Sequence, residues 1–224
     1  MILLAIVAAL PQQGQATAMD QAADCRPFIA QAERHFHLPP GLLGAIALTE
    51  SGQGGAPYPW ALNIDGEPLI APDFAAAAAL LRRPDGHPRR DVAIGCMQIH
   101  MQFHLQSFTD PEWALQPGHN VWYAAQFLDQ LYRRYGDWLS ATAHYHASAP
   151  AAQRRYLCQV GAHLRATGPG TGIALGLAGC PAGDLAPRGP AYPRRAQSPE
   201  ERQRSAIMAA RQAGGIILLG AKSR

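Results

Sequence analysis

The feature that most constrains this fold is a long helical stripe of apolar residues near the middle of the chain. The segment runs from Asn120 to Tyr135 and is followed by Gly136, a residue typical of helix C-termini. Its apolar positions recur every three or four residues, at Val121, Ala124, Leu128, Leu131 and Tyr135. That spacing places them on one face of an α-helix, and the face must be buried against other elements. A mainly helical fold is therefore expected.

Other segments carry the same signal, and glycine and proline residues divide them. We expect further helices over residues 24–37, 40–50, 137–147 and 153–164. Pro40 is placed to open the second of these, and the stretch "SGQGG" follows its end at Glu50. The central helix begins near Asn120, which we interpret as its N-cap rather than as a ligand-binding group.

Between Glu50 and Asn120 the pattern is no longer that of long helices. "WALNIDGEPLI" predicts two extended arms joined at Asp65-Gly66, a dipeptide typical of tight hairpin turns. "DFAAAAALLRR" predicts a short helix, "RRPDGHPRR" a loop, and "GCMQI" a further apolar stretch. The residues thus indicate a mainly α domain with a small β-hairpin insertion.

The N-terminal residues 1–18 differ from the rest of the chain. They contain an apolar run from Ile2 to Leu10 and end in Ala16-Thr17-Ala18, a small-x-small cleavage pattern. We interpret them as a signal peptide that directs the protein to the periplasm, with an uncleaved N-terminal helix as the alternative. The domain itself is expected over residues 19–167.

The C-terminal residues 168–224 read as a Pro/Gly-rich linker and basic tail, with a short helix expected over 198–213. Residues 1–187 hold 11 Arg against 14 Asp and Glu, whereas residues 188–224 hold eight basic and two acidic residues. A mildly acidic body gives no reason to expect nucleic-acid binding. The tail either contacts anionic wall polymers, lipid or a partner protein, or it is simply solvated.

Export would allow the cysteines to form disulfides. Three pairings are possible for Cys25, Cys96, Cys158 and Cys180. Cys96 lies in an apolar run, so we expect it to be a buried thiol. Cys25 and Cys158 fall on expected helices, and we expect a disulfide between them that joins the first and last helices of the domain.

Glu50 stands at the end of an almost wholly apolar helix, in "AIALTESGQG". Burial of a charged carboxylate is costly, so a carboxyl at the rim of an apolar wall is expected to have a raised pKa and to stay protonated near neutral pH. Such a group can donate a proton to a leaving oxygen, as glycosidases require. The alternative is an ordinary solvated glutamate at a helix end.

Three segments, in order, resemble the motifs of the soluble lytic transglycosylases. They are "ALTESG", "GCMQIH" and "NVWYAAQFLDQLYRRYGDWLSATAHYHAS", and the resemblance covers about residues 25–160. It implies the lysozyme-like, mostly helical fold shared with goose-type lysozymes. It also implies non-hydrolytic cleavage of the β-1,4 bond between N-acetylmuramic acid and N-acetylglucosamine in peptidoglycan, with a 1,6-anhydro product.

The resemblance also implies roles for individual residues. Glu50 corresponds to the sole catalytic acid and base, and no cofactor is needed. The residues that would lie along the substrate are Ser51, Asn63, Met97, Gln98 and Tyr145. Core packing is an alternative explanation for Met97, and the inner stripe of its own helix is one for Tyr145. The partner is the glycan strand, and a secretion, pilus or flagellar assembly is a further partner that a local wall-cutting enzyme can serve.

The sequence departs from the family pattern at three positions. His146 and Ser148 replace the Asn and Gly of the last motif, and His100 stands where Asn is common. These changes leave open the details of substrate recognition, but the acid is retained.

Two other functions remain open. A goose-type lysozyme would use water, with Asp65 or Asp91 as a candidate second carboxylate, and a non-catalytic accessory would use the same cleft only to bind the wall. A metal site is not expected, because the helix-spaced pair lacks the glutamate of the zinc-protease motif and the His-x-His pairs point to opposite helix faces. The pairs are His35 and His37, His100 and His104, and His144 and His146.

Overall fold

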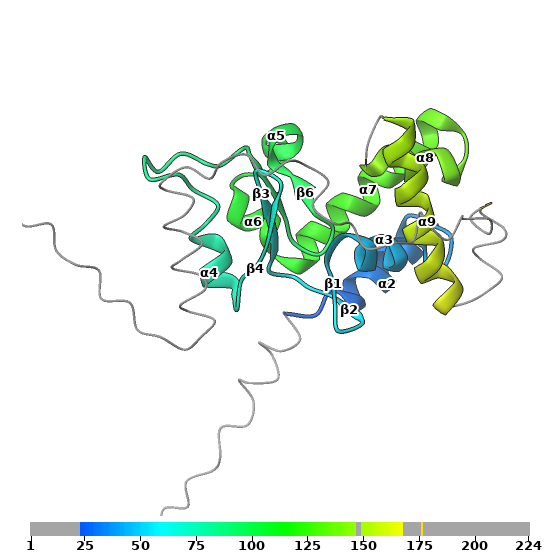
Figure 1. The fold of residues 1–224 in the computed structure, drawn as a ribbon, viewed down its shortest axis with the longest axis horizontal. Coiled ribbons are helices and arrows are strands. Elements are labelled where there is room, and N and C mark those ends of the chain that lie inside the picture. Colours follow the sequence, from blue (N-terminus) through cyan, green and yellow to red (C-terminus); the bar gives the residue numbers. More distant parts are fainter. Residues whose placement is uncertain (1–22, 147–148, 168–175, 177–224) are drawn as a thin grey trace, which may run out of the picture. The chain divides into compact units, whose positions relative to one another are not determined.

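The computed structural model describes residues 23–146, 149–167 and 176, which are mainly helical with a small antiparallel sheet (Figure 1). This confirms the expected fold class. The helices are α2 (Arg26–His35), α3 (Leu42–Ser51), α4 (Phe74–Ala78), α5 (Met101–His104), α6 (Pro111–Leu115), α7 (Pro117–Tyr135), α8 (Trp138–His146) and α9 (Pro150–Thr167), with a 3₁₀ turn η1 (Leu105–Ser107). The strands are β1 (Gly52–Gln53), β2 (Ala56–Pro57), β3 (Ala61–Ile64), β4 (Glu67–Ile70), β5 (Val92–Ile94) and β6 (Ile99–His100).

Several expectations concern the ends of the chain and lie outside the described residues. These are the signal peptide over 1–18, the linker and basic tail over 168–224, and the helix over 198–213. Within the described part, no helix is both long enough and apolar enough to cross a membrane.

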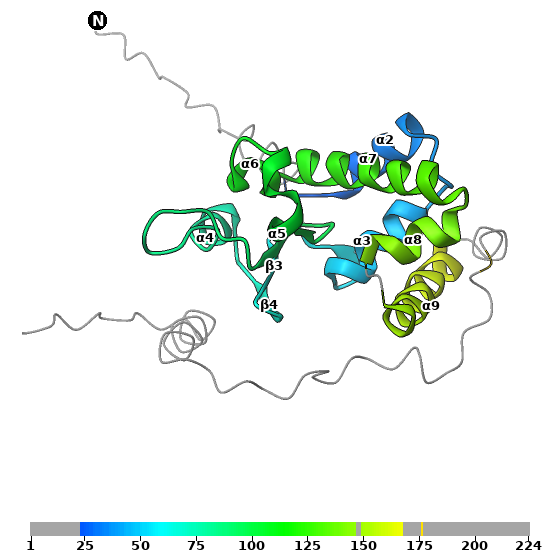
Figure 2. The same ribbon diagram turned by 90° about the horizontal axis from the view of Figure 1, so that it is seen from above.

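The helix α7 runs the length of the helical part and contacts α2, α6 and α8 (Figure 2). Four residues of its predicted apolar stripe are buried, Val121, Ala124, Leu128 and Leu131, whereas Tyr135 at the end of the helix is 36% exposed. Gly136 ends the helix with φ 82°. The prediction of Asn120 as its N-cap is wrong, because the helix begins at Pro117 and Asn120 lies within it, fully buried. Proline suits a first helical position, since its fixed φ matches the helix and its missing N–H is not needed there.

The helix α3 carries the apolar wall predicted from "AIALTESGQG". Leu42, Leu43 and Ile46 are 0% exposed, and the helix contacts α2 and α9. Its N-terminus is held by a contact that the sequence did not reveal: the Glu33 carboxylate accepts hydrogen bonds from the N–H groups of Gly41 (3.1 Å) and Gly44 (3.2 Å). An acidic side chain at this end also complements the helix dipole.

The sheet contains the predicted hairpin and two strands beyond it. Strands β3 and β4 pair in antiparallel register with Ile64 opposite Glu67, so Asp65 and Gly66 form a two-residue turn. Both have positive φ, 53° and 86°, as a type I′ turn requires. The strand order of this four-stranded sheet is β4-β3-β5-β6, and β1 and β2 form a separate antiparallel pair. The hairpin is therefore confirmed, and "GCMQI" forms the connection and start of β6 beyond β5.

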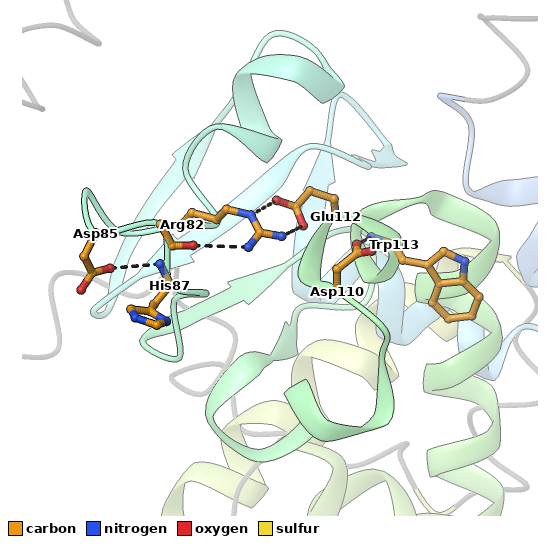
Figure 3. A network of polar contacts seen from close by, with 7 residues as sticks. Arg82, Asp85, His87, Asp110, Glu112 and Trp113 are labelled. Atoms are coloured by element: carbon orange, nitrogen blue, oxygen red, sulfur yellow. Dashed lines mark hydrogen bonds and ion pairs between the residues drawn. The ribbon is translucent and has the colours of Figure 1, made fainter.

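The segment that follows β4 is braced against α6 (Figure 3). Arg82 donates two hydrogen bonds to the Glu112 carboxylate, at 2.6 and 2.8 Å. The loop that follows Arg82 is stabilised by Asp85, whose carboxylate accepts a hydrogen bond from the His87 N–H at 3.0 Å. The ion pair is exposed and stabilises the fold little on its own, but its two-point geometry fixes the direction of the loop.

The disulfide differs from the prediction. Cys25 is bonded to Cys96, with a Cα–Cα distance of 6.4 Å across 71 positions of sequence. The prediction of a Cys25–Cys158 disulfide is therefore wrong, and so is the prediction of a free thiol at Cys96, although Cys96 is fully buried as expected. Cys158 is also disulfide-bonded. Spacing along the sequence did not show that the "GCMQI" segment returns to the start of α2.

Candidate active site

Glu50 lies where α3 ends and the backbone turns into β1. The side chain is 13% exposed, so most of it is shielded by the apolar wall of its own helix and by neighbouring elements. Gly52 is required two positions after Glu50, because any Cβ there would collide with the carbonyl oxygen of Leu48. The chain can therefore leave the helix after Ser51 and turn into β1 close to the carboxyl group of Glu50.

That space is a pocket of about 220 Å³ between the end of α3 and the β3–β4 hairpin. Four of the predicted site residues line it: Glu50 and Ser51 from α3, and Asn63 and Gln98 from the region of the sheet. Apolar strand residues form the rest of the wall. The lining residues are Leu48, Thr49, Glu50, Ser51, Gly52, Gln53, Ala61, Leu62, Asn63, Pro68, Leu69, Ile70 and Gln98. Glu50 is the sole carboxylate among them. A larger pocket of about 440 Å³, between the end of α2 and α7, is lined by none of the predicted site residues.

Gln98 has an unusual backbone conformation for a residue with a side chain, with φ 47°. Its side-chain nitrogen donates to the carbonyl oxygens of Ala61 (3.1 Å) and Gly95 (3.0 Å). The strained backbone and the two hydrogen bonds fix the carboxamide at the wall of the pocket. Strain of this kind is commonly retained where a side chain must be aimed.

Gly95 and Asn120 build the turn that carries Gln98. Gly95 has φ 77°, and a Cβ on it would lie 2.6 Å from the side chain of Asn120. The Asn120 amide fills this space: it accepts from the Met97 N–H at 2.9 Å and donates to the carbonyl oxygens of Ile94 (3.0 Å) and Ala114 (3.1 Å). Asn120 therefore belongs to the support of the site and does not face the pocket.

Met97 contributes to the site through its backbone and not through its side chain. The side chain is 0% exposed and belongs to the hydrophobic core, in agreement with the alternative explanation of this residue. The carbonyl oxygen accepts a hydrogen bond from the Tyr145 hydroxyl at 2.9 Å. The turn is thus held by Asn120 from α7 on one side and by Tyr145 from α8 on the other.

Tyr145 lies close enough to Glu50 to respond to its charge. Burial of the hydroxyl, and then the negative charge of Glu50, raise the pKa of Tyr145 well above its usual value. The phenol therefore stays protonated and can act only as a hydrogen-bond donor toward Met97 over the physiological range. Phe127 of α7 packs against the ring, with 5.7 Å between the ring centroids.

Ser51 is 6% exposed, and its hydroxyl is engaged by protein groups. The oxygen lies 2.8 Å from the carbonyl oxygen of Cys96 and accepts from the Tyr58 N–H at 3.1 Å. These bonds join the end of α3 to the turn that carries Gln98, and they make Ser51 a positioning group in this structure.

The candidate second carboxylates of a hydrolase lie on the sheet, and neither lines the pocket. Asp65 occupies the β3–β4 turn, and Asp91 is paired with Arg89 at 2.7 Å. Among the residues that the structure describes, no three His, Cys, Asp or Glu side chains are placed to hold a metal ion.

His146 is a neighbour of Glu50 that sequence reasoning did not place in the site. Its Nδ1 lies 3.8 Å from Glu50 Oε1. The available signal was the departure of "HYHAS" from the family motif, but that difference does not indicate which way the imidazole points.

A comparison with protein families agrees with this arrangement. The model described as the transglycosylase SLT domain matches residues 27–163, which is more than half of the chain. Comparisons with curated proteins and with solved structures found no match.

Proposed function

Because the chain belongs to the transglycosylase SLT domain family, we propose that it is a peptidoglycan lytic transglycosylase with Glu50 as its sole acid and base. Membership supports an activity of the lytic transglycosylase type on peptidoglycan in general. The observation that carries the finer proposal is the pocket beside α3, where Glu50 lies with Asn63 and Gln98 and no second carboxylate lines the wall.

In the proposed reaction Glu50 first donates its proton to the oxygen that bridges N-acetylmuramic acid and N-acetylglucosamine. The 2-acetamido group of the muramic residue serves as the internal nucleophile, so the second carboxylate of ordinary glycosidases is not needed. Glu50, now a carboxylate, then takes the proton of the 6-hydroxyl of the same sugar. That oxygen attacks C1, displaces the acetamido oxygen from it and so closes a 1,6-anhydro ring, and no water is consumed.

The amide side chains at the pocket wall suit a sugar substrate. Asn63 on β3 offers a carboxamide to hydroxyl or acetamido groups. Gln98 on the adjoining turn offers its side-chain oxygen as an acceptor, because its nitrogen already donates to the carbonyl oxygens of Ala61 and Gly95. In this proposal the other predicted residues do not contact the glycan. They hold the turn and the end of α3 in place, and they are Ser51, Met97 and Tyr145. Contact with glycan is assigned to Glu50, Asn63 and Gln98.

We also propose that the protein acts in the periplasm. Peptidoglycan lies outside the cytoplasmic membrane, and the Cys25–Cys96 disulfide is of a kind that persists in oxidising compartments.

The test is analysis of the products released from purified peptidoglycan by the wild type and by Glu50→Gln. The wild type should release 1,6-anhydro muropeptides, lighter by one water than hydrolysis products, and Glu50→Gln should be slower by about 10²–10⁴-fold. Glu67→Gln, an exposed glutamate on the hairpin, is the matched control and should keep wild-type activity.

Three results would contradict the proposal. Products that contain the added water would identify a hydrolase of the goose-type lysozyme kind. Near-wild-type cleavage by Glu50→Gln would remove Glu50 from the mechanism. Binding of the wild type to isolated wall without any cleavage would indicate an accessory protein.

A further inference from the structure

The pocket between the end of α2 and the C-terminal half of α7 has no part in the proposed reaction. Its volume is about 440 Å³, and it shares no lining residue with the pocket of Glu50. We propose that this α2–α7 pocket and the indole of Trp122 beside it form a second binding site, which holds a stretch of the glycan backbone of peptidoglycan without cleaving it. The choice of this polymer rests on the proposed function, whereas the site itself contains no residue of that reaction.

A group of aromatic rings borders the α2–α7 pocket, where the two helices lie side by side (Figure 2). Trp122 is 39% exposed, and its ring contacts those of His35 and Phe36, with 4.8 and 5.4 Å between centroids. His35 and Phe36 line the pocket, and their own rings meet edge to face at 4.8 Å. The three rings therefore support one another, so the indole is held in place before a ligand binds. Less conformational entropy is then lost on binding.

The helix α7 supplies polar groups that continue from the indole. Gln126, Asp129, Gln130 and Arg133 line the pocket, and their spacing from Trp122 places all of them along one side of the helix. This row is about 16 Å long, at about 1.5 Å for each of its residues. Both glutamines are exposed, and a carboxamide can donate and accept hydrogen bonds at the same time.

The charges on this wall favour a neutral ligand. The carboxylate and the guanidinium that line the pocket, those of Asp129 and Arg133, are paired with each other at 2.9 Å. Their charges offset each other, so the pair gives little attraction to a strongly charged partner.

A chain of pyranose rings fits this combination of groups. The C–H faces of such rings pack on an indole, and the hydroxyl and acetamido groups at their edges pair with carboxamides. The glycan backbone of peptidoglycan is a neutral chain of this kind wherever its lactyl groups carry stem peptides in amide linkage.

A second contact on the polymer would strengthen the hold of the protein on the wall. Once one site has bound a polymer, the other binds it in an intramolecular step, and the two affinities reinforce each other. The second site should therefore matter for insoluble wall, which can reach both pockets, more than for a short fragment that fills only the pocket of Glu50.

The first measurement uses NMR signals of the four indole N–H groups in the full chain with Glu50→Gln, which suppresses turnover of the probe. The probe is the β-1,4-linked tetramer of N-acetylglucosamine, a neutral chain. The Trp122 signal, assigned by its absence from Trp122→Ala protein, should shift on titration. The matched control is Trp113, an indole 41% exposed and stacked on His119, whose signal should stay in place.

The second measurement is cosedimentation with purified insoluble peptidoglycan, again in the Glu50→Gln protein. Trp122→Ala should weaken binding by about threefold to tenfold, the effect expected for loss of one aromatic contact. Trp113→Ala, which removes an equally exposed indole, should bind as before. The double substitution Gln126→Ala with Gln130→Ala changes two exposed side chains and should also weaken binding, which keeps the test independent of the folding of Trp122→Ala.

Several results would overturn the proposal. They are a Trp122 signal that the tetramer does not move, a signal moved by free stem peptide instead, and wall binding that is unchanged in both pocket variants or equally weakened in Trp113→Ala. In protein that keeps Glu50, Trp122→Ala should lose more rate on insoluble wall than on a short soluble fragment, and equal losses would make Trp122 a support of the active site. Absence of cleavage by the wild type would contradict the proposed function but not the second binding site.

Discussion

At the scale of single residues, the geometry of the site depends on groups that do not face the pocket. Asn120 joins three backbone segments through its amide, and Gly95 provides the space for that amide. Gln98 can reach the pocket wall only because this turn adopts left-handed backbone angles at both ends. Replacement of a buried supporting residue should therefore affect stability and activity together.

Asn120→Ala should lower the free energy of unfolding by about 2–4 kcal/mol, because one backbone N–H and two carbonyl groups lose their buried partner. Urea denaturation measures this loss. Gln126→Ala, at an exposed position of the same helix, is the control and should change stability by less than about 0.5 kcal/mol. An Asn120→Ala protein as stable as the control would show that water or a shift of the turn replaces the amide.

The motifs in the sequence point to residues that line the pocket. Glu50, Asn63 and Gln98 were predicted from short segments, and the fold brings all three to one pocket. The supporting contacts were not predictable in the same way. The role of Asn120 depends on a glycine 25 positions earlier, and the orientation of His146 depends on the packing of α8 against α9. Neither leaves a pattern in the local sequence, since both are set by tertiary packing.

At the scale of elements, the disulfide connects two segments that lie 71 positions apart in the sequence. Cys25 is the N-cap of α2 and Cys96 lies in the turn between β5 and β6, next to Met97. Ser51 also bonds to the carbonyl oxygen of Cys96, so covalent and hydrogen-bonded supports converge on one residue. The disulfide therefore anchors the site turn to the start of the helical part.

The double substitution Cys25→Ala with Cys96→Ala should cost about 2–5 kcal/mol in the free energy of unfolding. The cross-link closes 71 positions of sequence, so its loss frees a long loop in the unfolded chain. Chemical reduction is a poorer test, because it would also break the disulfide of Cys158. Peptidoglycan cleavage at 25 °C should persist, since the turn keeps its bonds to Asn120, Tyr145 and Ser51. An unchanged urea midpoint would contradict this account.

The elements themselves were predictable to different degrees. The helices and the Asp65-Gly66 hairpin follow from signals that lie within each segment, namely apolar spacing, proline, and glycine in left-handed turns. Strands β5 and β6 have three and two residues, and such short segments become strands only because β3 offers an edge with which β5 can pair. The start of α7 was misjudged because Pro117 and Asn120 carry competing signals, and proline at the first position prevailed.

At the scale of the whole molecule, the fold disfavours the protonated, charged form of three histidines. Burial lowers the pKa of His100, and His104 and His163 have their pKa lowered for the same reason; for His104 the neighbouring His100 adds to the effect. Nδ1 of His100 also accepts the Gln102 N–H at 3.2 Å, which requires that nitrogen to be unprotonated. At mildly acidic pH these histidines therefore bind fewer protons in the folded protein than in the unfolded chain.

The sign of the resulting pH dependence follows from this difference. Below the unfolded histidine pKa of about 6.5, the unfolded chain takes up more protons than the folded protein, so stability falls as the pH falls. The carboxylates with lowered pKa act in another window: Asp24, bonded to Arg26, and Asp137, bonded to the Ser140 N–H, lose their stabilising contribution only below about pH 4. The histidine effect can therefore be observed separately.

We expect the free energy of unfolding to decrease between pH 7 and pH 5 by on the order of 1 kcal/mol, after allowance for solvent screening at these partly exposed rings. Urea denaturation across this range measures the slope. His100→Asn is the informative variant, because asparagine can still accept the Gln102 N–H at the start of α5 but has no proton to gain. Its slope should be shallower than that of the wild type, with similar stability at pH 7. A stability that rises on acidification, or a variant with the wild-type slope, would show that His100 is not held neutral by the fold.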